Sequence, residues 1–306
     1  MTLENYFAEL ADQNKTITVL RLTRLSDLTP EEVKFLRQAW VEIDVERRRQ
    51  IMHQIAKLAG SHAKLNFDSV FQACLRDSDA VVRAKAIQGL WECDDCSLIT
   101  NLIELLERDE SKLVRAAAAG ALGKFALLAE LRKVHPRYLI TITQSLLNVI
   151  DSKREAVEVR CRAIEAIAPL SISRVKDVIY AAYRSKNLKL RSSAICAMGR
   201  SCDPLWLPIL LRELSSVDPE MRFEAARACG ELGEEEAAPH LIKLIRDSDI
   251  HVQLAATKAL GRIRGIEEKQ AFYRYLPQPD EQASQMVEEA WHELEAEEDS
   301  PFFELR

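Results

Sequence analysis

Glycine, proline and aromatic residues are scarce in this sequence. Its 306 residues include 9 glycines and 10 prolines, too few for an all-β chain full of turns or for a disordered chain. Aromatic residues make up only 6%, so a hydrophobic core must be built from Ala, Leu, Ile and Val. Because apolar residues still reach 47%, such a core can be continuous, and its small side chains suit closely packed helices.

No segment has the pattern of a targeting or membrane-spanning sequence. The first residues, Met1-Thr2-Leu3-Glu4-Asn5, lack the basic flank and apolar run of a signal peptide. No apolar stretch approaches the roughly 20 residues that span a bilayer. Seven cysteines form an odd number without framework spacing, which indicates reduced thiols. These absences predict a cytoplasmic protein that makes no membrane contact.

Acidic residues are concentrated at the end of the sequence. The net charge is −6, yet residues 280–306 hold ten acidic residues and a single base, Arg306. The remaining residues include 41 bases and 38 acids, so this part of the chain is slightly basic.

One template recurs along the chain at a nearly constant spacing. Its anchor is an arginine, followed three, four, seven and eight positions later by small or apolar residues. The anchors are Arg48, Arg83, Arg115, Arg160, Arg191 and Arg222, continued by Gln253 and Ser284 at the same position. The successive gaps are 35, 32, 45, 31, 31, 31 and 31 residues. Four equal gaps in succession indicate an internal repeat.

Each anchor is expected in the first turn of a helix. Four residues before the anchors come Asp44, Asp79, Ser111, Ala156, Asn187, Asp218, Asp249 and Asp280, and all but Ala156 are good N-cap residues. The small and apolar positions share one helical stripe, which we expect to face the neighbouring hairpin. A shorter apolar helix precedes each anchor helix, as in residues 102–106, 209–211 and 241–245.

Repeated helix–turn–helix units predict an all-α fold, an α-α superhelix of about eight helical hairpins. We expect an N-terminal capping segment at residues 1–30, the solenoid at 31–296 and an acidic tail at 297–306. Tyr6, Phe7 and Leu10 suggest a helix that covers the first hairpin, whereas residues 17–20 fit either an extended or a helical conformation.

Two of the repeats carry a recognisable motif. One reads Asp249-x-x-Val252-x-x-Ala255-Ala256-x-x-Ala259-Leu260-Gly261-x-Ile263, and the other reads Met221-Arg222-x-x-Ala225-Ala226-x-x-Cys229-Gly230-x-Leu232-Gly233. Both resemble the HEAT-like repeat found in phycobilisome (bilin) lyases, and the resemblance covers about residues 31–295. It implies an armadillo/HEAT-like solenoid with an Asp–Arg network between repeats. Many unrelated functions share this motif.

The six anchor arginines, called here the arginine ladder, invite a phosphate-binding interpretation. They lie on the same stripe as the small residues, however, where a charge must be paired. The capping residue four positions earlier lies on the same helix face. We therefore interpret Arg48, Arg83, Arg115, Arg160, Arg191 and Arg222 as structural.

The opposite side of the second helices, called here the second-helix face, lies two, five and nine residues after each anchor. Its bases are Lys57, Lys85, Lys124, Arg162, Arg200, Arg227, Lys258 and Arg262. Its acids are Glu92, Glu165, Glu224, Glu231, Glu289 and Glu293. Eight bases against six acids are too balanced for a nucleic-acid track. Without the last hairpin, eight bases against four acids indicate a mild preference for an acidic partner. An ordinary solvated face is the alternative.

Two further segments are candidates for partner contact. The 45-residue gap contains Arg132, Lys133, His135 and Arg137, which we expect on a protruding loop that either contacts a partner or is merely tolerated. The tail carries Phe302 and Phe303 among its acids. We hypothesise that the tail binds a groove on its own or another subunit.

Known catalytic or metal-binding patterns are not apparent. Cys93 and Cys96 have the spacing of a metal knuckle or redox pair, but a zinc site needs four ligands and no second such pair or nearby His pair exists. We therefore expect no catalytic residue, no metal and no cofactor.

The favoured function is a non-catalytic scaffold for protein–protein interaction whose partner is another protein. The alternative, which rests on the resemblance, is an accessory subunit of a bilin (tetrapyrrole) lyase or isomerase. A helical-repeat nucleic-acid-binding protein comes third. The sequence does not specify the oligomeric state.

Overall fold

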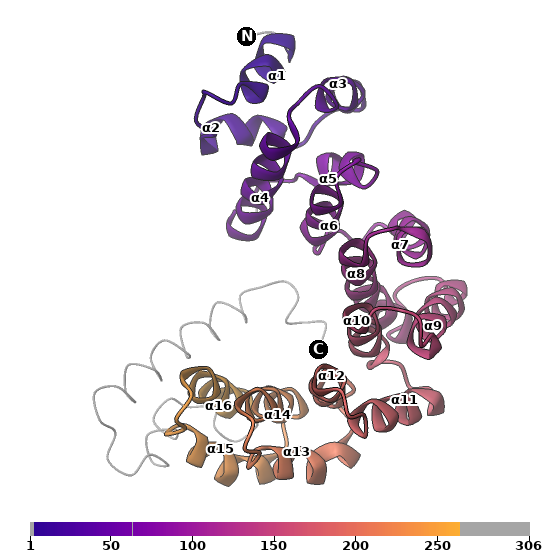
Figure 1. Ribbon diagram of the computed structural model, residues 1–306, viewed down its shortest axis with the longest axis vertical. Helices are drawn as coiled ribbons and strands as arrows, with labels where there is room; N and C mark the ends of the chain where they lie inside the picture. The colour runs from indigo at the N-terminus through magenta and orange to yellow at the C-terminus, as the bar shows by residue number, and fades with distance from the viewer. Residues whose placement is uncertain (1–2, 63, 264–306) are drawn as a thin grey trace. The chain divides into compact units, whose positions relative to one another are not determined.

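The computed structural model describes residues 3–62 and 64–263 of the chain (Figure 1). These ranges contain sixteen α-helices, three short 3-10 helices and no strand. The all-α fold of stacked helical hairpins predicted from the sequence is confirmed. No helix in these ranges combines the length and the hydrophobicity needed to cross a lipid bilayer.

Residues 1–166 form the first of two compact units. Its helices are α1 (Leu3–Ala11), α2 (Val19–Leu22), η1 (Thr23–Leu25), α3 (Pro30–Trp40), α4 (Val45–Ser61), α5 (Asp68–Cys74), α6 (Ala80–Gly89), α7 (Ser97–Arg108), α8 (Lys112–Glu130), α9 (Pro136–Asp151) and α10 (Val157–Ile167). The border between the units lies at the last residue of α10. From α3 onwards these helices form four hairpins.

The second unit begins at Ile167, and its described part forms three hairpins. Its helices are α11 (Ser173–Tyr183), α12 (Leu188–Arg200), η2 (Pro204–Trp206), α13 (Leu207–Glu213), α14 (Pro219–Leu232), η3 (Glu235–Ala237), α15 (Ala238–Leu244) and α16 (Ile250–Arg262). The eighth hairpin, expected around Asp280 and Ser284, and the acidic tail lie outside the described residues. The domain boundaries therefore stay predictions.

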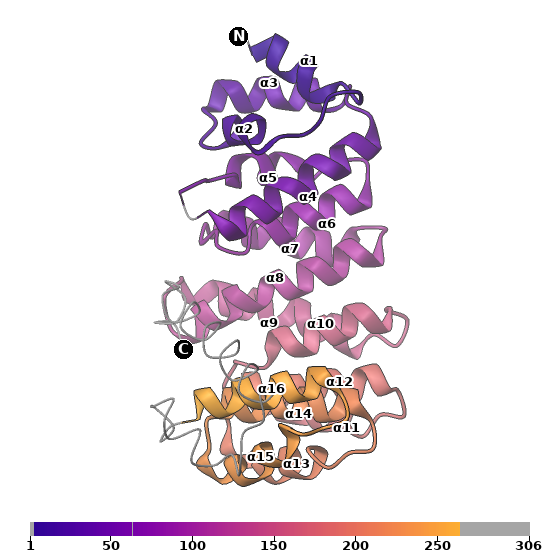
Figure 2. The same cartoon turned by 90° about the vertical axis from the view of Figure 1, so that its left-hand side faces the viewer.

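Within each unit the hairpins stack so that their helices form two layers. In the first unit α3, α5, α7 and α9 make one layer, and α4, α6, α8 and α10 make the other (Figure 1). In the second unit the layers are α11, α13 and α15 against α12, α14 and α16 (Figures 1 and 2). The second helices of successive hairpins are thus neighbours, as the small-residue stripe predicted.

The stripe is the centre of the core. Three residues after each anchor the side chain is completely buried, with 0% exposure at Ile51, Ala86, Ala118, Ala163, Ala194, Ala225 and Ala256. Larger side chains fill the space between the layers, among them Phe67, Phe71, Phe125 and Trp206. Small residues on the stripe let neighbouring helices approach closely, which is why few aromatics suffice.

The turns between the helices of a hairpin follow the capping pattern of the sequence. Asp44, Asp79, Asn187, Asp218 and Asp249 are N-caps whose side chains accept backbone N–H groups of the helix that follows. Ser111 is also an N-cap, but its side chain makes no capping hydrogen bond. These side-chain caps occur in five of the seven described hairpins, always at the same place relative to the anchor, and so set the register of the repeats.

The N-terminal segment packs on the first hairpin. Tyr6, Phe7 and Leu10 of α1 are buried, and the Phe7 ring lies 5.5 Å from that of Phe35 on α3. Arg47 of α4 donates from Nε to the carbonyl of Leu10 at 2.8 Å. Part of the ambiguous stretch at residues 17–20 is helical, because α2 begins at Val19.

Candidate interaction surface

Backbone contacts between second helices define the surface that remains for a partner. In the second unit, a Cβ added at Gly199 would lie 2.6 Å from Cα of Ala228, and one at Gly230 would lie 2.7 Å from Cα of Ala259. In the first unit, the corresponding distance from Gly123 to Cα of Ala166 is 3.1 Å. The second helices therefore touch at the eighth position after Arg115, Arg191 and Arg222.

In the first unit, several bases of the second-helix face already interact within the chain. Lys124 is half-buried, with its Nζ 3.0 Å from a carboxylate oxygen of Asp94. Arg162 lies 2.7 Å from Glu165 on the same helix. Lys85 donates to the side chain of Gln88 at 3.0 Å. Lys57 is exposed and forms no ion pair with another described residue.

In the second unit, too, some bases of the second-helix face interact with neighbours and one is exposed. Arg227 lies 3.2 Å from Glu224 and 3.8 Å from Glu231, and its guanidinium lies over the Phe223 ring. Lys258 and Arg262 are half-buried, whereas Arg200 is exposed and forms no ion pair in the described part of the unit. Part of the positive charge of the second-helix face is therefore already neutralised within the chain, and less remains than the number of bases indicates.

The arginine ladder joins consecutive hairpins. Four ladder arginines bind an acidic residue in the turn of the next hairpin, at 2.7–2.8 Å: Arg48 with Asp77, Arg83 with Asp109, Arg115 with Glu155 and Arg222 with Asp247. Helix geometry suggested the capping residue, four positions before each arginine, as its partner. The capping Asp residues accept backbone N–H groups of their own helices instead. Asp218, for example, accepts from the N–H of Glu220.

The same guanidinium groups also hold their own turn. Nη1 of Arg222 donates to the carbonyls of Ser216 and Val217, and Nη1 of Arg83 donates to those of Asp77 and Ser78. Gln253, which replaces the arginine, keeps one such bond, to the Asp247 carbonyl. The Arg83, Arg115 and Arg222 side chains thus each connect two turns, which explains why a long, branched donor recurs at this position.

Two ladder arginines depart from this scheme. Arg160 donates from Nε to the carbonyl of Ile150 at 3.1 Å, within the first unit. Arg191 lies 3.9 Å from Glu213, beyond hydrogen-bonding distance.

Sequence reasoning missed the acids that complete the ladder. Asp77 accepts from the Trp40 indole N–H and from Arg48, both at 2.7 Å, and its side chain is fully buried. A signal was present, because Asp77, Asp109 and Asp247 each stand two residues before an N-cap. The stripe pattern relates residues of a single helix, whereas these acids lie in the turn of the next hairpin.

The long gap in the repeat is absorbed mainly by helices rather than by a protruding loop. Helix α8 runs to Glu130 and α9 begins at Pro136, so Arg132, Lys133 and His135 lie on a short, exposed connection. The His135 ring accepts the N–H of Arg137 and caps α9, and Arg137 lies over the Tyr138 ring. Their contact with a partner stays a prediction.

Three of the seven thiols lie in environments that disfavour the reactive thiolate. Burial raises the pKa of Cys93 to about 11 and that of Cys229 to about 12. Burial likewise raises the pKa of Cys74 far above its usual range. Within residues 3–62 and 64–263, no three His, Cys, Asp or Glu side chains are grouped so that they could hold a metal ion.

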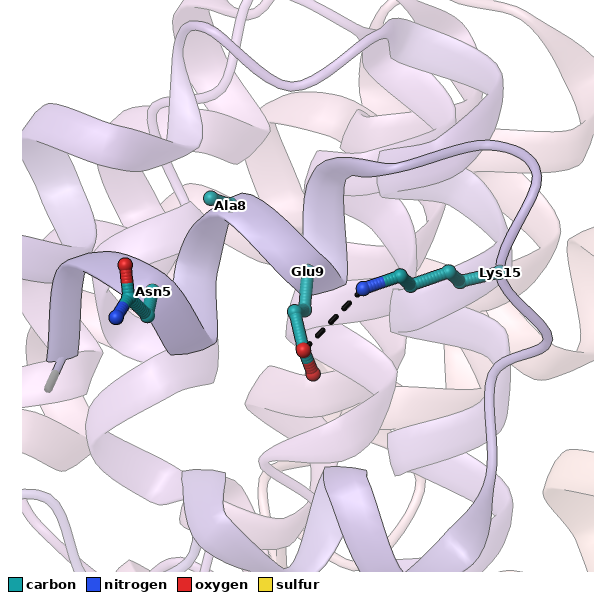
Figure 3. Close-up of a pocket in the computed structure, with 4 residues that line it drawn as sticks. All are labelled: Asn5, Ala8, Glu9 and Lys15. Atoms are coloured by element: carbon teal, nitrogen blue, oxygen red, sulfur yellow. Dashed lines mark ion pairs between the residues drawn. The ribbon is translucent and has the colours of Figure 1, made fainter. Parts of the chain in front are cut away.

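A hollow beside α1 is lined by Asn5, Ala8, Glu9 and Lys15 (Figure 3). The Lys15 ammonium lies 3.2 Å from Glu9 across this hollow, and Arg21 approaches Glu9 at 3.6 Å. The lining combines one neutralised carboxylate with small or amide side chains, so it offers no nucleophile.

The sequence is similar to a family of proteins built from helical repeats. A family model described as HEAT repeats matches residues 67–137 and 207–290, together just over half of the chain. No curated protein matches the sequence.

Solved structures of similar fold include a chain of the complex of CpcE and CpcF of phycocyanin lyase from Nostoc sp. PCC7120. The identity is 17%, the TM-score is 0.57, and the match covers 86% of this chain and 95% of that one. Escherichia coli YibA matches at 19% identity and a TM-score of 0.45, over 67% of this chain and 73% of that one. At these identities the similarity concerns the fold.

Proposed function

This chain belongs to the family of HEAT-repeat proteins, and on that premise we propose that it is a cytoplasmic, non-catalytic scaffold that binds another protein through its second-helix face. The observation that supports the proposal best is that the second helices pack on the neighbouring hairpins with one side and carry exposed charges on another. Ladder arginines and small residues on the stripe hold the hairpins together, whereas Lys57 and Arg200, at outward positions of the same helices, are exposed.

The charge of the second-helix face supports a partner with a mildly acidic surface. Lys57 and Arg200 are exposed and form no ion pair with other described residues, so their charges can be neutralised by a partner. The other bases are held in place by neighbours, as Arg227 is by Glu224 and Glu231. A surface of this kind favours specific contacts over general attraction to polyanions.

All seven cysteines are free, which supports a reducing compartment. Buried thiols with a raised pKa are poor nucleophiles, which supports a role in binding rather than catalysis.

The test is a differential capture with the full chain. Tagged wild-type protein, the variant Lys57→Glu/Arg200→Glu and the control Lys34→Glu/Arg37→Glu are incubated with the same native lysate. The control carries the same change of charge on exposed residues of α3, in the opposite layer of the first unit. We expect proteins that bind the second-helix face to be retained by the wild type and the control and to be lost from the first variant.

Equal retention by all three proteins would contradict the proposed surface, and equal loss from both variants would indicate attraction by net charge alone. Proteins recovered with the first variant at undiminished levels would have to bind elsewhere on the chain. The retained proteins are then purified and their affinities measured one by one.

An accessory role in a tetrapyrrole lyase or isomerase is the second candidate, favoured by the similarity of fold to the phycocyanin lyase chain. It ranks lower because this similarity concerns the fold alone. Incubation of the pure full chain with a linear tetrapyrrole tests it: a shift of the absorbance band on binding supports the lyase role, and an unchanged spectrum removes it.

A further inference from the structure

In each described hairpin of the second unit, the turn between the two helices contains one equivalent position. The residue at this position is charged in one hairpin and neutral in the other two. The residue two positions before the N-cap accepts the N–H of the N-cap residue through its side chain. Asp247 does so for Asp249 at 2.9 Å, Ser216 for Asp218 at 3.3 Å and Ser185 for Asn187 at 3.1 Å. Ser216 thus stands where a ladder acid stands in the next hairpin, with a hydroxyl group in place of a carboxylate.

This replacement leaves Arg191 without the partner that its equivalents have. Arg222 binds Asp247 through two hydrogen bonds of 2.7 Å each. Arg191 would meet Ser216 by the same geometry, and the acid near it is instead Glu213, at 3.9 Å. Glu213 is itself shared, because it accepts the Tyr183 hydroxyl and lies 3.8 Å from Arg212.

Five bases, called here the α11–α12 basic cluster, lie between the end of α11 and the first turn of α12 and on α13: Arg184, Lys186, Lys189, Arg191 and Arg212. The guanidinium groups of Arg191 and Arg212 lie 5.9 and 5.7 Å from the centre of the Tyr183 ring. Arg184 and Lys186 are exposed and form no ion pair with other described residues. Glu213, which is buried, lies 3.9 Å from Arg191 and 3.8 Å from Arg212.

Exposed aliphatic side chains lie on the same turns. Leu188 follows Asn187 directly and is 52% exposed, and Val217, beside Ser216, is 98% exposed. The Val217 backbone is held in place, because its carbonyl accepts from Arg222 at 3.2 Å. A fully exposed aliphatic group on a fixed turn loses little conformational entropy when a partner covers it.

We propose that the α11–α12 basic cluster binds an acidic protein segment that also carries aliphatic or aromatic side chains. Carboxylates of the segment would occupy the place of the missing ladder acid at Arg191 and would neutralise Arg184 and Lys186. Its apolar side chains would cover Leu188 and Val217. A nucleic acid fits less well, because its phosphates would leave the exposed Leu188 and Val217 uncovered.

The test measures binding of a fluorescein-labelled twelve-residue peptide, in which glutamate alternates with leucine and phenylalanine, to the full chain by fluorescence anisotropy. A peptide with glutamine in place of glutamate and a single-stranded DNA of similar charge are measured in parallel. The variants are Arg184→Glu/Lys186→Glu, Ser216→Asp and the control Lys34→Glu/Arg37→Glu. Ser216→Asp restores the ladder acid, so it removes the anion site without disturbing the fold.

We expect Arg184→Glu/Lys186→Glu to weaken binding about tenfold or more and Ser216→Asp to weaken it about threefold, while the control and the second-helix-face variant Lys57→Glu/Arg200→Glu bind as the wild type does. Ser216→Asp should at the same time raise the urea midpoint, which separates loss of binding from loss of fold.

The proposal is overturned if Ser216→Asp raises the midpoint and leaves the affinity unchanged, or if the control loses as much affinity as the cluster variant. It is also overturned if the DNA binds more tightly than the acidic peptide. Because the second-helix face is varied separately, failure of the proposed scaffold function and failure of this inference give different patterns.

Discussion

Arg83 and Asp109 form a two-point ion pair that joins two consecutive hairpins of the first unit. Nε and Nη2 of Arg83 each lie 2.8 Å from a carboxylate oxygen of Asp109, and both side chains are more than nine-tenths buried. The carboxylate raises the pKa of Arg83 above its usual value, chiefly through these hydrogen bonds. Removal of Arg83 would leave the buried carboxylate of Asp109 without its partner.

Replacement of Arg83 by methionine should destabilise the first unit strongly. The change leaves the Asp109 carboxylate buried and removes the bonds to the carbonyls of Asp77 and Ser78. We expect a loss of about 3–5 kcal/mol, measured by urea unfolding followed by circular dichroism. The control is Arg76→Met, whose partner Glu104 is 3.7 Å away on an exposed surface, and it should cost less than about 1 kcal/mol. Equal effects of the two changes would contradict a structural role for the ladder.

Replacement of Gly230 by alanine should weaken the stacking of α14 on α16. The new methyl group would lie 2.7 Å from Cα and 2.9 Å from Cβ of Ala259, and a backbone atom cannot move aside as a side chain can. We expect a loss of about 1–3 kcal/mol in urea unfolding. Gly120 on α8 is the matched control, because an added Cβ meets nothing within 4 Å there. Gly120→Ala should stabilise the protein by up to about 1 kcal/mol through helix propensity.

Stability should fall as the pH is lowered through the range in which the paired carboxylates titrate. Hydrogen bonds from Arg49 lower the pKa of Asp79 to about 2 from its usual 3.8, and Arg222 lowers that of Asp247. Because the folded pKa lies below the unfolded one, this stabilisation is complete above about pH 4 and disappears as the pH falls towards 2. Urea midpoints measured at pH 7, 4, 3 and 2 should show the decline.

The variant Asp79→Asn tests the assignment of this pH dependence. It should be less stable than the wild type at pH 7 and should lose less stability between pH 4 and 2. A variant with an unchanged acid dependence would show that other carboxylates are responsible.

Thiol reactivity should differ sharply between the seven cysteines. Cys202 is exposed, whereas Cys74, Cys93 and Cys229 are buried and have a raised pKa. At neutral pH, Ellman's reagent should modify Cys202 first and the buried three only after urea is added. The variant Cys202→Ser should remove the fastest phase of the reaction. Rapid modification of Cys93 in the native protein would contradict its burial.

Much of the fold could be predicted because its signals are local. The anchor spacing and the N-caps each depend on residues within a few positions, so the register of the seven described hairpins follows from the pattern alone. The stripe positions Ala86, Ala194 and Ala225 are completely buried, as their spacing predicted. The conformation of residues 17–20 did not follow, because α2 is short and depends on packing against the first hairpin.

The sequence by itself determined the class of fold, most helix starts and the structural role of most ladder arginines. The tertiary structure decided which charges are neutralised, because the partners come from other hairpins: Asp77, Asp109 and Asp247 lie 29, 26 and 25 residues from Arg48, Arg83 and Arg222. It also showed that Arg162 and Arg227 already bind acids of their own helices and that Arg191 lacks a close acid. Whether two charged side chains pair depends on their distance in space. The spacing of residues along the sequence shows which side chains are candidates, but it does not give that distance.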